Sequence, residues 1–408
     1  MKLVCLLPVS TDARIQRRLG ALRRHGIDPE VLAFERPQYP GRPPSNAYQS
    51  LGVISHGRYV RRLRAIVRAL PLVRSACVGA DVVYAFSLDL LALAWLATRW
   101  SRQKPRFVYE VADVRAVLVG ETVRARIFRA IERHLLRGTS LLVVTSQAYI
   151  SGFYHRVQNL IDLPHLLIEN KPDLDEAAAP KRALRHTRAC TIGYFGLIRC
   201  RRSWEALRRI AAGGNGRIRV HVRGVPLGIP EFERDVAASP WIEYGGPYVA
   251  PDDLPEMYAG IDLCWIAHRM SQHHSLLWNR ANRFYEACAL HTPMIAQAGT
   301  QDGAVVARDG LGLCIDLADP DGAVARVLEI EGSDIDQWQR HMLDVPRSVY
   351  TEDGEHQTLA NEILRVLAIE GSNIDQWQRN MLTVPRSVYT ENGEHQALAS
   401  EILRLATA

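Results

Sequence analysis

Residues 282–296, N-R-F-Y-E-A-C-A-L-H-T-P-M-I-A, decide the fold of this chain. Apolar and small residues recur at helical spacing after Asn282, and His291-Thr292-Pro293 ends the helix because proline cannot continue it. Residues 294–300 then predict a short buried strand and a glycine-containing loop. Glu286 therefore falls in the first turns of a helix, beside the strand-to-loop edge where open α/β sheets bind ligands. The alternative interpretation of Glu286 is a solvated helix carboxylate.

The composition is that of a globular protein with two or three domains. The chain has 408 residues, of which 47% are hydrophobic, so wholesale disorder is excluded. Its seven cysteines lie far apart without a C-x-x-C pair, which is typical of reduced core residues in a cytosolic protein. The longest apolar run, residues 88–97, is too short to span a bilayer. We therefore expect a protein that is soluble or peripheral to a membrane.

Basic residues gather early in the chain, whose net charge is +6. The segment Arg58–Arg74 carries six arginines on one predicted helix face and apolar residues on the other. Such a helix can lie on anionic lipid headgroups at the inner leaflet. An ordinary surface helix with solvated arginines is the equal alternative. Nucleic-acid binding is not expected, because the arginines lack interleaved aromatic residues and a recognised motif.

Two series of alternating strand-like and helix-like segments predict two Rossmann-like, doubly wound parallel sheets that face a cleft. The first series occupies residues 1–172, and the second occupies 190–325 after a polar linker at 173–189. The predicted strands are 2–7, 29–34, 81–85, 107–111, 140–145 and 165–169, then 191–195, 218–222, 241–244, 262–266, 294–296 and 311–315. No G-x-G-x-x-G follows the first strand, which disfavours a dinucleotide dehydrogenase.

The C-terminus holds a tandem repeat. Residues 326–364 and 365–403 align without gaps and are identical at 32 of 39 positions. Two copies are too few for a stacked solenoid, so we interpret them as a duplicated helical segment. The first copy directly follows the second α/β half, so it is expected to reach a docking site for the chain end before the second copy does.

Taken together, these features resemble the retaining glycosyltransferases of family 4, which have the GT-B architecture. The similarity is greatest to the bacterial exopolysaccharide branch, the succinoglycan-type transferases, and covers residues 1 to about 364. It implies a cytoplasmic hexosyltransferase, peripheral on the inner face of the plasma membrane. Such an enzyme takes a nucleotide diphosphate sugar as donor and a lipid-linked saccharide as acceptor. No cofactor and no essential metal are expected, since no Asp-x-Asp motif follows a suitable strand.

The resemblance assigns donor-side roles to charged residues of the second half. Glu286 would accept hydrogen bonds from the ribose hydroxyls, with Asn282 and Arg283 one turn earlier at the helix start. Arg199 and Arg202 would stabilise the departing diphosphate as catalytic residues. An exposed basic loop is the alternative interpretation of the two arginines.

Three further donor-binding candidates come from loops. Gly196 would let a ligand approach the backbone. Gly224 ends the next predicted strand, and Tyr248 belongs to a G-G-P-Y loop that borders the base in similar enzymes. For Gly224 and Tyr248, an ordinary loop without a binding role explains the residues equally well.

One departure from the family concerns the transferred sugar. Many members have a carboxylate eight positions before the helix glutamate, and this chain has Trp278 there. The contact with the sugar is therefore missing or replaced. His273, His274 and Asn279 are the candidate substitutes.

Candidates on the N-terminal side follow predicted strands. Asp113 is the catalytic candidate, since it lies where relatives have an important His or Asp. Asp12, Arg14, Asp89 and Glu110 are acceptor-side candidates, and a helix N-cap is the alternative for each carboxylate.

Two other kinds of function are open to a chain of this fold. A GT-B phosphorylase would need a pyridoxal lysine, and residues 191–408 contain no lysine; an epimerase acting on similar donors is the related enzyme hypothesis. A non-catalytic scaffold that binds saccharide or partner proteins is the alternative from a different class. Nucleotide binding separates these readings.

Overall fold

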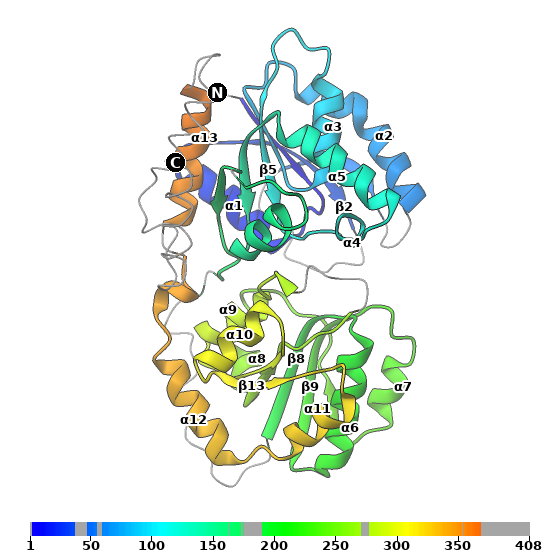
Figure 1. Ribbon diagram of the computed structural model, residues 1–408, viewed down its shortest axis with the longest axis vertical. Coiled ribbons are helices and arrows are strands. Elements are labelled where there is room, and N and C mark those ends of the chain that lie inside the picture. The colour runs from blue at the N-terminus through cyan, green and yellow to red at the C-terminus, as the bar shows by residue number, and fades with distance from the viewer. Residues whose placement is uncertain are drawn as a thin grey trace.

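The computed structural model describes residues 2–36, 47–54, 59–161, 163–172, 174, 190–270, 277–352 and 354–368. Figure 1 shows two lobes, each built on one parallel sheet, and the last described helix returns to the first lobe. Most of the predicted linker, His273, His274 and nearly all of the second repeat copy lie outside the described residues.

The N-terminal lobe contains a seven-stranded parallel sheet in the order β3-β2-β1-β4-β5-β6-β7. Its strands are β1 (Leu3–Leu7), β2 (Glu30–Glu35), β3 (Gln49–Val53), β4 (Val82–Ala85), β5 (Arg106–Val111), β6 (Thr139–Val144) and β7 (His165–Leu167). Every residue of β1 and β4 is buried, which explains their continuous apolar sequences. The sequence pattern misses β3, an edge strand in which only Leu51 is buried.

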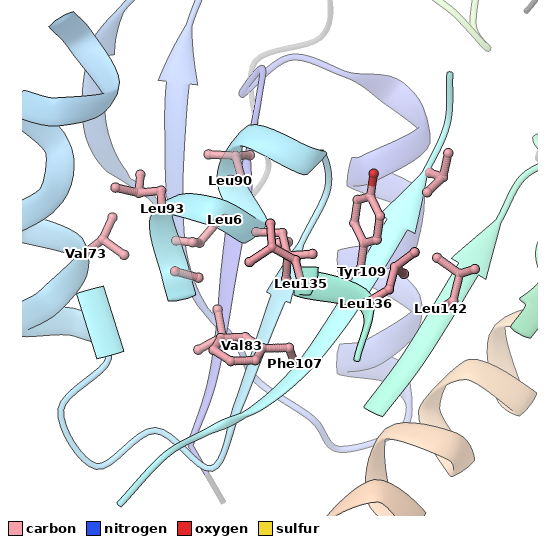
Figure 2. Close-up of a cluster of buried hydrophobic side chains, with 14 of the residues drawn as sticks. Leu6, Val73, Val83, Leu90, Leu93, Phe107, Tyr109, Leu135, Leu136 and Leu142 are labelled. Carbon is pink, nitrogen blue, oxygen red and sulfur yellow. The ribbon is translucent and has the colours of Figure 1, made fainter. Parts of the chain in front are cut away.

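Helices cover both faces of this sheet. They are α1 (Ala13–Arg24), α2 (Tyr59–Ala76), α3 (Leu88–Thr98), α4 (Ala116–Val119), α5 (Val123–Leu136) and a π-helix, Tyr149–His155. Figure 2 shows the core beneath α2, α3 and α5, where Val73, Leu93 and Leu135 meet sheet residues such as Val83 and Phe107. Helix α1 packs on the opposite face.

The C-terminal lobe contains a six-stranded parallel sheet in the order β10-β9-β8-β11-β12-β13. Its strands are β8 (Cys190–Ile198), β9 (Ile218–Pro226), β10 (Ile242–Tyr244), β11 (Leu263–Trp265), β12 (Met294–Gln297) and β13 (Gly312–Ile315). Its helices are α6 (Arg201–Gly214), α7 (Phe232–Ala237), α8 (Leu254–Ala259), α9 (Asn282–Ala289), α10 (Gln301–Arg308) and α11 (Pro320–Leu328). The sequence pattern misses α7, α10 and α11.

The first repeat copy joins the two lobes. Helix α12 (Gly332–Leu343) packs on the C-terminal lobe, with Met342 buried there. Helix α13 (Glu355–Ala368) then lies beside α1 on the N-terminal lobe (Figure 1). Its apolar side chains join the core of that lobe: Leu359, Ala360, Ile363 and Val366. Most of the docked helix belongs to the first copy, as expected from its position in the chain, and its last turn, with Val366, belongs to the second.

Polar contacts fix where α13 begins. Lys171 Nζ lies 2.6 Å from Glu355 Oε1, and Arg18 Nη1 lies 2.6 Å from His356 Nε2. Burial first, and then the charge of Arg18, lower the pKa of His356 to about 3. The imidazole is therefore neutral at physiological pH and accepts from the guanidinium.

Candidate active site

Helix α9 brings Arg283 and Glu286 to the carboxyl edge of the C-terminal sheet. Ala281 precedes the helix in an extended conformation, and its backbone N–H donates to Asp302 Oδ2 at 2.9 Å. Arg283 and Glu286 are both buried, whereas Asn282, at the first helical position, is exposed. The predicted helix start is thus held in place by a residue of α10.

Glu286 lies in a buried polar setting. Tyr258 donates its hydroxyl proton to Glu286 Oε2 at 3.1 Å. Burial raises the pKa of Glu286, whereas the Tyr258 hydrogen bond and the charges of Arg283 and Arg17 lower it. These partners favour the carboxylate, which is the form that accepts hydrogen bonds from a diol.

Tyr248 and Gly196 belong to the same cluster as Glu286. Burial and the nearby Glu286 carboxylate raise the pKa of Tyr248, while Arg283 acts in the opposite direction. Gly196 has a φ of +97°, and a Cβ there would lie 3.8 Å from the Tyr248 hydroxyl. The structure therefore brings four predicted donor-side residues together.

Gly224 has a structural reason to be glycine. It pairs with Gly196 in the β8–β9 ladder at a φ of +132°. A Cβ at Gly224 would lie 2.8 Å from the carbonyl carbon of Gly196, so any side chain would distort that ladder. Gly224 supports the backbone at Gly196.

Arg283 is held rigidly by three groups. Its Nη1 donates to Trp265 O at 3.0 Å, its Nη2 lies 3.3 Å from the ring nitrogens of His268, and its guanidinium lies 5.3 Å from the Tyr194 ring centroid. Arg199 also acts on Tyr194, since its charge lowers the pKa of that phenol while burial raises it to about 12. Arg199 and Arg283 therefore both lie near the Tyr194 side chain.

Arg202 is anchored at the end of β13. Its Nη1 donates to Leu317 O at 3.2 Å. Hydrogen bonds from the Ala318 backbone and the Gln297 side chain lower the pKa of the neighbouring Asp316, and Arg269 and Arg202 add to this effect. The basic residues of this edge thus come from the segments after β8 and β11.

A small polar pocket opens at the same edge. It is lined by Ile266, His268, Asn279, Ala281, Gln297, Thr300 and Asp302. Asn279 was a predicted substitute for the missing carboxylate, and it does line this pocket. The sequence pattern misses His268, Gln297 and Asp302, although each follows or ends a predicted strand.

Asp302 is a buried carboxylate in this pocket. Within the described residues its Oδ1 accepts no hydrogen bond, and the nearest cation is Arg280, whose Nε lies 3.7 Å away. Burial raises the pKa of Asp302 to about 6, against the opposing charge of Arg280. The pocket therefore contains a carboxylate with unused accepting capacity.

Trp278 points away from the pocket, toward the N-terminal lobe. Its ring lies 6.0 Å from that of Phe153, and its carbonyl accepts a hydrogen bond from Ser146 Oγ at 2.6 Å. A Cβ at Gly152 would lie within 2.6 Å of Trp278 Cδ1, so only glycine fits beneath the indole. The residue that replaces the family carboxylate is an inter-lobe contact.

On the N-terminal side, Glu110 is wholly buried. It accepts from the Tyr84 hydroxyl, and its oxygens lie 3.5 Å from Arg14 Nη1 and 3.6 Å from Arg18 Nε. Glu110 therefore holds arginines and does not reach a substrate itself. Asp12 caps α1 through the backbone N–H groups of Arg14 and Ile15 at 3.0 and 3.3 Å, as the N-cap interpretation predicts.

Asp89 and Asp113 lie in different settings. Asp89 pairs with Arg62 and, at 3.0 Å, with Arg115, and these charges hold its pKa low despite burial. Asp113 is exposed just after β5, close enough to Tyr149 for its charge to raise the pKa of that buried phenol. The Asp89 carboxylate is thus engaged by two arginines, whereas the Asp113 side chain is accessible to solvent.

Arg17 of α1 was missed from sequence and lies opposite Glu286. Its Nη2 donates to Asn170 O at 3.4 Å. Burial and the charge of Arg18 lower its pKa to about 10, while Asp12 and Glu286 raise it. The two lobes therefore contribute opposite charges to one site.

The described residues contain neither a metal-binding cluster nor a membrane-spanning helix. No group of three or more His, Cys, Asp or Glu side chains there is arranged to hold a metal ion. Likewise, none of the described helices has the length and apolarity needed to cross a membrane.

Two facing Rossmann-like lobes, each built on one parallel sheet, form the GT-B architecture. The family described as "Glycosyl transferase 4-like domain" matches residues 12–154. The succinoglycan biosynthesis protein ExoL of Rhizobium meliloti is 28% identical over 324 residues, which are 76% of this chain and 79% of the relative. Residues 12–154 therefore match a family 4-like glycosyltransferase domain, and most of the chain is similar to a succinoglycan biosynthesis protein, in agreement with the resemblance seen in the sequence.

Solved structures agree with this fold. Sucrose-phosphate synthase from Thermosynechococcus elongatus superposes with a TM-score of 0.66 at 13% identity, covering 90% of this chain and 100% of the other. Anabaena HepE in complex with UDP-glucose superposes with a TM-score of 0.57 at 14% identity, covering 94% and 99%. The predicted GT-B fold is confirmed.

Proposed function

We propose that this protein is a retaining hexosyltransferase. It moves a hexose from a nucleotide diphosphate sugar to a hydroxyl of a lipid-linked saccharide during synthesis of an exopolysaccharide or another cell-surface polysaccharide. The carrying observation is the cluster of Glu286, Arg283, Tyr248 and Gly196 at the sheet edge, facing Arg17. The succinoglycan relative and the HepE complex with UDP-glucose support the pathway and the donor class.

The donor would bind along the edge of the C-terminal sheet. Glu286 accepts hydrogen bonds from the ribose diol, and Tyr248 borders the nucleoside near Gly196. Arg199, Arg202 and Arg283 supply positive charge for the diphosphate. Because Arg283 is already fixed by Trp265 and His268, its charge requires no reorganisation as the diphosphate departs.

Transfer would proceed on the face of the sugar that the diphosphate leaves. The bond from the anomeric carbon to the diphosphate oxygen breaks, and a bond from that carbon to the acceptor oxygen forms on the same face. The acceptor proton passes to the departing diphosphate. Asp113 is the accessible carboxylate at the end of β5, and we assign it to orienting a sugar hydroxyl. Basic side chains take the role of a metal ion in this scheme.

The transferred hexose would occupy the polar pocket beside α9. Asp302 then supplies the carboxylate that position 278 lacks, because Asp302 lines the pocket and its buried Oδ1 accepts no hydrogen bond among the described residues. Asn279 and His268 add neutral polar groups. The pocket is suited to a sugar with several hydroxyl donors.

We assign the protein to the cytoplasm, on the inner face of the plasma membrane, where a nucleotide sugar and a lipid-linked acceptor meet. Exposed arginines of α2, such as Arg64 and Arg68, would add attraction to anionic lipid. Much of the apolar side of α2 faces the core, since Ala69 and Val73 are buried and Ile66 and Leu70 pack on it, whereas Val67 is exposed.

A panel of nucleoside diphosphates and their hexose derivatives tests this function. A ligand present at 100 times its dissociation constant stabilises the folded state by about 2.7 kcal/mol, which a thermal melt detects. The hexose derivative that stabilises most is then supplied with lipid-linked saccharide, and the anomer of the product is determined. Stabilisation without transfer or donor turnover would favour the scaffold, and no stabilisation by any nucleotide would refute the proposal.

A further inference from the structure

Helix α5 presents an inverted pattern, with apolar side chains outside and a carboxylate inside. Val123, Ile127 and Ile131, spaced four residues apart on one stripe, are 71%, 54% and 44% exposed. Glu132, the only acidic residue of α5, is buried among Tyr109, Tyr154 and Gln158. Folding alone favours the reverse arrangement, so the outer stripe indicates a contact with something beyond the described chain.

The stripe continues onto α3. The Trp95 ring meets the His134 ring of α5 edge-on, with centroids 5.5 Å apart. The Arg99 guanidinium lies 5.2 Å from the Trp95 centroid and 5.7 Å from that of Trp100, which is 73% exposed. An exposed tryptophan beside an arginine is typical of side chains placed at a membrane–water interface.

The charge of this surface is positive. Arg124, Arg126 and Arg133 are exposed on α5, and the nearest exposed acidic residue in sequence is Glu121, just before the helix. Apolar side chains surrounded by arginines match the acyl boundary and the anionic headgroups of a bilayer.

We propose that the outer face of α5, continued by Trp100 just after α3, is the surface on which this protein binds an anionic membrane. The assignment builds on the proposed function, in which the acceptor is lipid-linked. Helix α5 begins at the carboxyl edge of the N-terminal sheet, because it follows β5 and α4, so the membrane would lie beside the mouth of the active site. A lipid-linked saccharide would then reach the site without leaving its leaflet.

Sedimentation of the full chain with vesicles tests the surface. Wild type is expected to bind phosphatidylglycerol-containing vesicles and not pure phosphatidylcholine at low salt. Ile127→Ser with Ile131→Ser should weaken that binding about tenfold or more. Arg124→Gln, Arg126→Gln and Arg133→Gln together should weaken it about a hundredfold. The matched control is Leu343→Ser with Leu364→Ser, two exposed leucines on α12 and α13, which should bind as wild type does.

Three results would overturn the assignment: no vesicle binding by wild type, undiminished binding by the isoleucine variant, or an equal loss in the leucine control. A change in solution mass without a change in vesicle binding would identify a protein interface and would overturn it too. All variants should keep their unfolding temperature and their stabilisation by nucleotide. A chain that binds vesicles but no nucleotide would refute the proposed function and leave the membrane surface in place.

Discussion

The indole of Trp278 rests on Gly152 of the opposite lobe so closely that a Cβ at position 152 would come within 2.6 Å of its Cδ1. Gly152→Ala should therefore destabilise the protein when Trp278 is present and should be nearly neutral, or favourable to the helix, after Trp278→Ala. A coupling of about 0.5–3 kcal/mol is expected from a double-mutant cycle of unfolding free energies. Additive effects would show that the two residues do not meet in solution.

Glu286→Gln is predicted to weaken binding of the nucleoside diphosphate. Each lost hydrogen bond between a charged acceptor and a ribose hydroxyl should cost about 1.5–3 kcal/mol. Calorimetric titration of wild type and variant measures the difference, and Asp262→Asn, a buried carboxylate at the other end of the same sheet, is the control. Equal affinities in a folded Glu286→Gln protein would remove the residue from the site.

Asp302→Asn separates binding of the sugar from binding of the nucleotide. The variant should bind UDP or GDP as wild type does but lose about ten- to a hundredfold in affinity for the matching hexose derivative. The amide oxygen can still accept from Ala281, so the start of α9 is preserved. If both affinities stay unchanged, the pocket does not use this carboxylate.

The same substitution should change stability in a pH-dependent way. The pKa of Asp302 is raised to about 6 by burial, with Arg280 and Arg283 opposing and Glu169 adding to the shift. The folded state therefore binds the extra proton, and this stabilisation is lost as pH rises from about 4 through 6. The free energy of unfolding of Asp302→Asn should exceed that of wild type by on the order of 2 kcal/mol at pH 7.5. This difference should disappear near pH 4. A difference in unfolding free energy that does not depend on pH would contradict a raised pKa of the buried Asp302 carboxyl group.

Replacing Arg199 and Arg202 together with glutamine should lower turnover more than it raises the Michaelis constant. Their charge is most useful when the diphosphate departs. Arg201→Gln is the matched control, because Arg201 is exposed and pairs with Glu231. Unchanged turnover would reject the two arginines. Activity lost to a chelator and restored by a divalent ion would assign their role to a metal.

Truncation tests the docking of α13, most of which belongs to the first repeat copy. A chain of residues 1–368 should fold and bind nucleotide like the full protein. A chain of residues 1–354 should lose more than about 5 kcal/mol of unfolding free energy, because it lacks the core residues Leu359, Ile363 and Val366. Unfolding temperature and solution mass compare the three proteins. Failure of the 1–368 chain to fold would show that residues beyond 368 are needed.

Local pattern predicts the central strands because they are buried on both faces and therefore uniformly apolar, as β1 and β4 are. It fails for β3, where Ser50 and Gly52 face outward on an edge, and for α10, where Gly303 interrupts a short helix. In both cases the element is stabilised by neighbours distant in sequence.

The same limit applies to the site. Glu286 and Arg283 share one helix turn and a recognisable motif, so sequence locates them. Tyr258 and Arg17 interact with Glu286 from segments distant in sequence, so no local spacing of residues predicts these contacts. The position of Glu110 at the end of a strand suggests a cleft residue, but in the structure Arg14 and Arg18 enclose it. The sequence gives the position of a side chain along a strand and does not give its partner.

The return of α13 to the N-terminal lobe constrains the order of events during synthesis. The sheet of that lobe is complete once β7 has emerged from the ribosome, yet one face still lacks the side chains of Leu359, Ala360, Ile363 and Val366. The whole second lobe must be made before they arrive. The nascent first lobe therefore exposes an apolar strip while the second lobe is being synthesised. A chaperone that prevents aggregation of the nascent chain would have to cover this strip.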